Sequence, residues 1–290
     1  SVVNHYNFRT HALDLAINNQ AIFDYSRFHW NANTIMSKSN ILSDHFSLLE
    51  MLVSPFIWIF GTYTLLVFQI FSILYGGIGI YKLIVFKSEN KVLGLLAMIF
   101  FYSVWGIYSA LSFDYHDNVV AAMFVPWLFY YFVRRRFVPM FIFFILILIS
   151  KENMALWAFF ISTGLFFLYI KDKQLRYISI ILGALSLIYF ILTIKYFIPY
   201  FFDKGMVYRH NSFSILGNSF SEVITTIITK PFYALTLLFK NHLQIASLNG
   251  VKAELHYMVL LSGGIFLIFK PQYLVMLVPI YAQKLFNDYF

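Results

Sequence analysis

Residues 137–170, "FVPMFIFFILILISKENMALWAFFISTGLFFLYI", indicate the fold class most clearly. It would be one continuous apolar segment if Lys151 and Glu152 did not interrupt it near the middle. A bilayer-spanning helix needs about 20 mostly apolar residues, because the hydrocarbon core is about 30 Å thick and each residue rises about 1.5 Å. Two apolar runs joined by a polar turn therefore predict a helical hairpin in a membrane, with the turn at a water boundary.

Composition extends this interpretation to the whole chain. Of its 290 residues, 60% are hydrophobic and only 12% are charged, whereas charged residues approach a quarter of a typical soluble domain. These proportions predict an integral membrane protein. The net charge is +8, but the lysines and arginines lie between apolar runs and form no single basic face, which argues against nucleic-acid binding. The absence of cysteine excludes disulfides, thiolate metal sites and cysteine nucleophiles.

We expect an all-α polytopic transmembrane bundle with about seven to nine spans. The predicted spans are residues 62–86, 92–111, 118–133, 137–150, 154–170, 177–198, 255–270 and 272–286. The simplest organisation is a single membrane domain over residues 1–290. Its expected parts are an outside loop with two interfacial helices (1–60), a core bundle (62–198), an outside loop with an interfacial helix (199–254) and the last spans (255–290).

The connections between the apolar runs alternate in charge. Basic side chains occupy every second connection, which the positive-inside rule places in the cytoplasm: Lys82, Lys87, Lys91, Arg134, Arg135, Arg136, Lys171, Lys173, Arg176 and Lys270. The other connections carry acids and histidines: Asp14, Asp44, Asp114, Asp117, Glu152, His11, His45, His116 and His210. This pattern predicts a multi-pass protein of the cytoplasmic membrane whose acidic face is turned to the periplasm or the exterior.

The predicted interfacial helices lie in three stretches. In "ALDLAINNQAIFDYSRF" (12–28), Leu13, Ile17 and Ala21 share one helical stripe, as in a helix that lies along the membrane surface. In "SDHFSLLEMLVSPFIWIF" (43–60), Ser43 or Asp44 is the expected N-cap, and Pro55 is expected to bend or end the helix before Gly61. In "EVITTIITKPFYALTLLFKNHL" (222–243), Lys230 and Pro231 break an apolar run, which favours a surface helix over a span.

Asp114, His116 and Asp117 fall within four residues at the start of a span. Ionisable groups at a membrane boundary favour a functional site, because burying one deeper costs a few kcal/mol unless it is paired or hydrated. A polar loop with a helix cap explains the same residues equally well. As oxygen and imidazole donors, Asp114, His116 and Asp117 are also candidate ligands of a divalent metal.

Further candidates lie on the same predicted face. Asp14 either favours the dipole of its helix or acts chemically. Asp44 and His45 either cap a helix or form a base with an orienting partner.

Two pairs of residues complete the candidate set. Lys151 and Glu152 either form a tight turn or contribute to a site. Arg209 and His210 either bind a phosphate or are simply solvated.

These motifs, in this order, resemble the bacterial membrane family called domain of unknown function 2079, over nearly all of the chain. The matching positions are Asp14, Leu15 and Gln20; His45, Phe46 and Pro55; Phe113, Asp114, His116 and Asp117; and Lys151, Glu152 and Asn153. Asp117 stands where the family more usually has Glu, and Asn153 where it has an acid. The resemblance also implies a preceding transmembrane helix and a C-terminal continuation, and we expect this sequence to be a piece of a longer chain.

The family is remotely similar to GT-C glycosyltransferases, and this similarity implies an activity. The expected reaction moves a sugar from a polyprenyl-phosphate donor to an acceptor at the outer face of the cytoplasmic membrane, with a divalent metal as a candidate cofactor. The implied catalytic residues are Asp14, Asp114, His116 and Glu152. The implied substrate-binding residues are Gln20, Asp44, His45, Asp117, Lys151, Arg209 and His210. A non-catalytic subunit or scaffold of a larger membrane complex, or a transporter-like protein, is the alternative.

Overall fold

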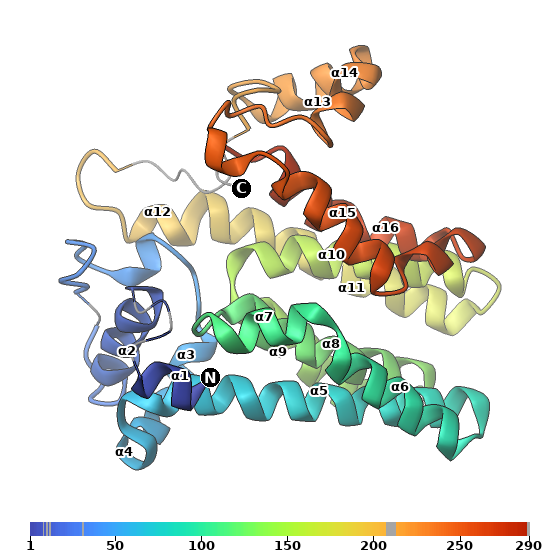
Figure 1. Ribbon diagram of the computed structural model, residues 1–290, viewed down its shortest axis with the longest axis horizontal. Helices are drawn as coiled ribbons and strands as arrows, with labels where there is room; N and C mark the ends of the chain where they lie inside the picture. The colour runs from blue at the N-terminus through green and yellow to red at the C-terminus, as the bar shows by residue number, and fades with distance from the viewer. Residues whose placement is uncertain (8, 10, 12, 31, 207–212, 289–290) are drawn as a thin grey trace.

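The computed structural model describes residues 1–7, 9, 11, 13–30, 32–206 and 213–288. These residues form helices, together with one isolated bridge between Asn33 and Lys38, so the predicted all-α class is confirmed for the described part of the chain. Figure 1 shows a body of long helices, with α2 and α3 at one end and α13 and α14 set apart from it.

Long apolar helices form the body of the molecule, and their bounds follow the hydropathy pattern closely. They are α5 (Thr64–Ser88), α6 (Lys91–Ser103), α7 (Trp105–Ser112), α8 (Asp117–Val133), α9 (Phe137–Ser150), α10 (Glu152–Leu168) and α11 (Lys173–Leu192). Helix α5 packs against α6 and α8, α8 packs against α9, and α10 packs against α9, α11 and α16 (Gln272–Leu285). Short connections place consecutive helices side by side.

The core lies where α5, α8, α9 and α10 meet. Val120, Phe144, Ile147 and Met154 are completely or almost completely buried there. Each fully buried apolar side chain of this size contributes roughly 1.5–3 kcal/mol relative to exposure to water. This core fixes the ends of α8 and α10, which carry the candidate site.

The N-terminal part contains a helix over most of the first predicted stretch, and the second predicted helix starts later than expected. The elements are α1 (Val2–Tyr6), α2 (Leu13–Tyr25), η1 (Ile41–Ser43), α3 (Leu49–Val53), η2 (Ser54–Phe56), α4 (Ile57–Phe60) and η3 (Gly61–Tyr63). In the predicted apolar stripe of α2, Ile17 and Ala21 are buried in a cluster with Ile41, whereas Leu13 is 65% exposed. The expected caps Ser43 and Asp44 do not start the second helix, which begins at Leu49.

The C-terminal part contains two short helices in the stretch predicted to form an interfacial helix, and a break in one predicted span. The elements are the π-helical turn η4 (Thr193–Phe197), α12 (Ile198–Tyr200), α13 (Phe220–Thr229), α14 (Pro231–Leu237), η5 (Ala246–Leu248), α15 (Val251–Leu261), η6 (Gly264–Phe269) and α16. The break between α13 and α14 falls at Lys230, as predicted. The predicted span at 255–270 is wrong, because Gly263 takes a left-handed φ of 90° between α15 and η6.

Fewer helices are long enough to cross a bilayer than the seven to nine predicted. Among the described residues, two helical segments qualify by length and composition, 49–88 and 173–200. The bent pair of α6 and α7, with an angle of 46° between its halves, would make a third. Helix α8, with 17 residues, is only about 25 Å long, and α9 and α10 are no longer. They are therefore shorter than the hydrocarbon core of about 30 Å.

The basic and acidic connections lie at opposite ends of the helices. At the basic end, Arg135 forms a salt bridge with Asp172, and Lys87 Nζ donates a hydrogen bond of 2.8 Å to Tyr169 Oη. At the other end, His45 contacts Glu152. Helix α5, with 25 residues, is about 37 Å long. The acidic and histidine-bearing segments therefore gather at one end of the body, away from Arg135 and Asp172.

Two glycines of α5 allow α8 to approach closely. A Cβ on Gly76 would lie 2.8 Å from Met123 Sδ and 3.2 Å from its Cα, and a Cβ on Gly79 would lie 2.9 Å from Trp127 Nε1. Small residues at such spacing let apolar helices pack backbone to backbone.

We expect Gly76→Leu to lower the free energy of unfolding by about 1–3 kcal/mol, because the added side chain must push α5 away from α8. The measurement is the thermal unfolding of the purified protein in detergent. Gly106→Ala is the control, since a Cβ there meets nothing within 4 Å. Equal unfolding temperatures for both variants would contradict the expectation.

Candidate functional site

The loop between α7 and α8 is held in place by a glutamine from α5. Gln69 is fully buried, and its Nε2 donates hydrogen bonds to the backbone oxygens of Asp114 (2.9 Å) and Ala110 (3.2 Å). Its Oε1 accepts a hydrogen bond of 2.9 Å from the His116 backbone N–H. A buried amide that uses both of its ends fixes its partners in one geometry. Gln69 therefore sets where Asp114 and His116 point.

His116 lies between two carboxylates. Its Nδ1 is 3.0 Å from Asp114 Oδ1, and its Nε2 is 3.8 Å from Asp14 Oδ2 on α2. The Asp114 side chain is completely buried, whereas the side chains of His116 and Asp14 are 40% and 53% exposed. The sequence places Asp14 a hundred residues before this loop, so the structure brings together two motifs that share no local signal.

A second cluster ties the turn before α10 to the segment after η1. Glu152 is buried and accepts hydrogen bonds from the Phe46 backbone N–H (3.0 Å) and from His45 Nδ1 (2.9 Å). Asp44 forms a salt bridge with Lys38. Glu152 is also the first residue of α10, where a negative charge is favoured by the helix dipole. The turn at Lys151 and Glu152 is thus both a helix start and a long-range anchor.

A third cluster consists of Tyr115, Asp117 and Glu50. Tyr115 Oη donates a hydrogen bond of 2.7 Å to Asp117 Oδ1. Burial raises the pKa of the Tyr115 phenol well above its ordinary value, and the charges of Asp117 and Glu50 raise it further, so this hydroxyl keeps its proton. Glu50 is 2% exposed and interacts electrostatically with Asp117 and with Lys151.

Members of all three clusters line one cavity of about 360 Å³. Its polar lining residues are Asp14, Asn18, Asp44, His45, Ser47, Glu50, Tyr115, His116, Asp117, Asn118 and Lys151. Glu152 is not among them and acts on the cavity through His45. Hence Asp14, the His116 loop and the turn at Lys151, which were predicted to share one face, meet around a common hollow.

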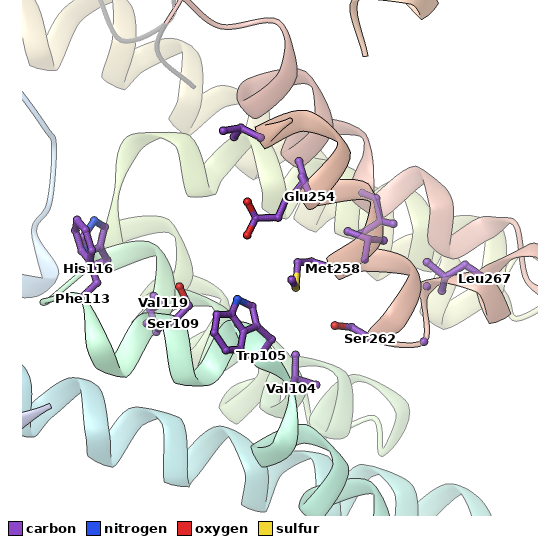
Figure 2. Close-up of a pocket in the computed structure, with 18 residues that line it drawn as sticks. Val104, Trp105, Ser109, Phe113, His116, Val119, Glu254, Met258, Ser262 and Leu267 are labelled. Carbon is purple, nitrogen blue, oxygen red and sulfur yellow. The ribbon is translucent and has the colours of Figure 1, made fainter. Parts of the chain in front are cut away.

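A larger apolar groove of about 790 Å³ opens beside this cavity. Figure 2 shows Trp105 and Ser109 on one side, Glu254 and Met258 on the other, and His116 at one end. The groove runs between α7 and the α15–η6 region. His116 lines both the groove and the polar cavity. An elongated apolar ligand in the groove would therefore end at the charged groups.

Some predicted site residues lie elsewhere. Gln20 does not line the cavity: its Oε1 accepts hydrogen bonds from Thr34, and its Nε2 donates to Ala32 O, so it holds the loop after α2. Arg209 and His210 lie outside the described residues. Asp117, a predicted metal ligand, instead accepts a hydrogen bond from Tyr115. The carboxylate that lies close enough to Asp114 and His116 to share a metal ion with them is that of Asp14.

Sequence reasoning missed Glu50, Gln69 and Tyr115. Glu50 was part of a predicted interfacial helix and Gln69 part of a predicted span, so neither was singled out. A polar residue inside an apolar run is itself a signal, because a buried polar group requires a partner. Glu50 and Gln69 both carry this signal. Tyr115 does not, because it is one of 21 tyrosines in the chain and nothing in its local sequence distinguishes it.

Comparison with known proteins identifies a family but no characterised relative. No curated protein and no solved structure matches the chain. A family model described as "Predicted membrane protein (DUF2079)" matches residues 4–289, which is nearly the whole chain and agrees with the apolar helices and the motif order. The chain therefore belongs to the DUF2079 family of predicted membrane proteins.

Proposed function

We propose that this protein is a membrane glycosyltransferase of the GT-C type that moves a sugar from a polyprenyl-phosphate donor to an acceptor hydroxyl. The observation that carries the proposal is the junction at His116, where a charged cavity meets an apolar groove of about 790 Å³. A lipid-linked sugar has the same two parts, a polar reacting head and a long apolar tail. The groove lies within the volume range of typical ligand sites, roughly 300–1,000 Å³.

Asp14 is the proposed general base. Its carboxylate is 53% exposed at the cavity, so an acceptor hydroxyl can reach it. The acceptor oxygen attacks the anomeric carbon while the bond from that carbon to the phosphate oxygen breaks. The acceptor proton passes to Asp14, and polyprenyl phosphate leaves with the bonding electron pair. A base positioned for such a transfer typically contributes a factor of about 10²–10⁴ in rate.

Lys151 is the proposed partner of the departing phosphate. It lines the same cavity as Asp14, and a lysine ammonium stabilises the negative charge that develops on a leaving phosphate. His45 and Asp44 line the cavity as well and would position the acceptor. In this proposal the cavity faces the outer side of the cytoplasmic membrane, as the positive-inside rule implies for the arginine-rich opposite end.

The experiment compares Asp14→Asn with the wild-type chain in two measurements. In membranes incubated with polyprenyl phosphates that carry one radiolabelled hexose, the variant should transfer the sugar on the order of 100-fold more slowly. In cells that depend on the protein, mass spectrometry of extracted lipids should show accumulation of the lipid-linked sugar in the variant. The exposed position of Asp14 means that the substitution should leave folding unchanged.

Asp24→Asn is the matched control. It removes the same charge from the same helix, but Asp24 does not line the cavity, so transfer should stay at the wild-type rate. Identical lipid-sugar profiles for wild type and a folded Asp14→Asn protein would overturn the catalytic proposal and favour the non-catalytic scaffold.

A further inference from the structure

Three potential metal ligands converge where α2 meets the loop before α8. One donor atom from each of Asp14, Asp114 and His116 can be chosen so that all three lie within 4.8 Å of one another. Two carboxylates and one imidazole form a mixed oxygen and nitrogen set. Such a set suits divalent ions of hard or borderline character.

The burial of Asp114 is an independent indication of a bound cation. Its side chain is completely buried, and neither carboxylate oxygen receives a hydrogen bond from the residues that the structure describes. A carboxylate taken out of water without hydrogen bonds is strongly destabilised unless a positive charge lies beside it. His116 Nδ1 approaches to 3.0 Å, but without hydrogen-bond geometry. Hydrogen bonds therefore do not stabilise the buried carboxylate of Asp114.

The spacing of these atoms also fits shared coordination. Adjacent ligands at metal–ligand distances of about 2.0–2.3 Å lie roughly 2.8–3.8 Å apart in octahedral or tetrahedral geometry. The separation of 3.0 Å between His116 Nδ1 and Asp114 Oδ1 falls within this range. Asp14 is half exposed, so its carboxylate can turn toward the same point. Gln69 holds the backbone on both sides of the ligand pair and limits the reorganisation that binding requires.

We propose that Asp14, Asp114 and His116 bind one divalent cation of the Mn²⁺ or Zn²⁺ class, with open coordination positions toward the cavity. Three protein ligands and an open position are the arrangement of reactive rather than purely structural metal sites. An anionic oxygen, such as that of a phosphate, is the chemistry that such an open position accepts. The inference concerns binding alone and stands whether or not the chain transfers sugars.

The test is direct titration of Mn²⁺ into the full chain, purified in detergent and stripped of metal with a chelator. Electron paramagnetic resonance follows the signal of free Mn²⁺, which decreases as the ion binds. The wild-type chain should bind one equivalent, and Zn²⁺ should displace it. Asp114→Asn and Asp14→Asn should each weaken Mn²⁺ binding by about tenfold or more.

Controls separate coordination from general attraction to an acidic surface. Asp24→Asn removes an equal charge from α2 outside the cluster and should bind Mn²⁺ like the wild type. Because Asp14 is exposed, the Asp14→Asn protein should fold, and its Mn²⁺ binding can be measured even if Asp114→Asn does not fold. Undiminished free Mn²⁺ in the presence of wild-type protein would overturn the proposal. Equal loss of binding in the Asp14 and Asp24 variants would overturn it too.

Discussion

Replacing Glu152 with alanine is expected to lower the free energy of unfolding by about 3–5 kcal/mol. Glu152 is 2% exposed and accepts hydrogen bonds from the Phe46 backbone N–H and from His45 Nδ1. Alanine would leave a buried backbone N–H without an acceptor and remove the charge that His45 faces, and each lost partner of a charged acceptor costs roughly 1.5–3 kcal/mol. The segment after η1 would also lose its long-range link to α10.

Thermal and denaturant unfolding of the detergent-purified chain would measure this loss. Glu152→Gln should lose less than the alanine variant, because an amide oxygen can still accept the Phe46 N–H. Glu254→Ala removes an exposed acid and should change the unfolding free energy by no more than about 0.5 kcal/mol. A Glu152→Ala protein as stable as the Glu254→Ala protein would show that the link between His45 and Glu152 does not support the fold.

Much of the helical body could be predicted from the sequence. Helices α5, α8, α9 and α10 begin and end within a few residues of the predicted runs, because uninterrupted apolar stretches bounded by charged connections leave few other arrangements. The grouping of Asp14, His116 and the Lys151 turn at one end also followed from the alternation of acidic and basic connections. Alternating connections constrain where residues lie along the helix axis.

The breaks in the helices could not be predicted in the same way. Average hydropathy is insensitive to the bend between α6 and α7 and to the left-handed Gly263, because one residue changes the backbone direction without changing the composition. The sequence also did not predict which residues pair across the site. Glu152 accepts a hydrogen bond from the Phe46 N–H, and Gln69 holds the His116 loop. Both contacts depend on which helices are neighbours. Sequence determined the end of the bundle at which each group lies, and packing determined its partner.

The largest remaining effect is expected at Lys151, whose charge faces two buried carboxylates. Glu50 and Asp117 are 2% and 6% exposed, so burial disfavours their ionised forms, and the charge of Lys151 favours the ionised form of each. Removing one member of a buried charge group typically costs about 3–5 kcal/mol, because the remaining charges lose their compensation. Lys151 is partly exposed, and solvent screening reduces the effect. For Lys151→Met we therefore expect a loss of about 2–3 kcal/mol in the free energy of unfolding.

A second substitution tests this explanation against simple loss of packing. Adding Asp117→Asn to the Lys151→Met chain should restore about 1 kcal/mol or more, since asparagine can still accept the Tyr115 hydrogen bond but carries no charge that needs a cation. In the wild-type background the same Asp117→Asn change should not stabilise the protein, because Lys151 already compensates the carboxylate. Lys151→Arg, which keeps the charge, should lose less than Lys151→Met. If the two losses simply add in the double variant, the lysine acts through its contacts and the electrostatic account of the cavity is wrong.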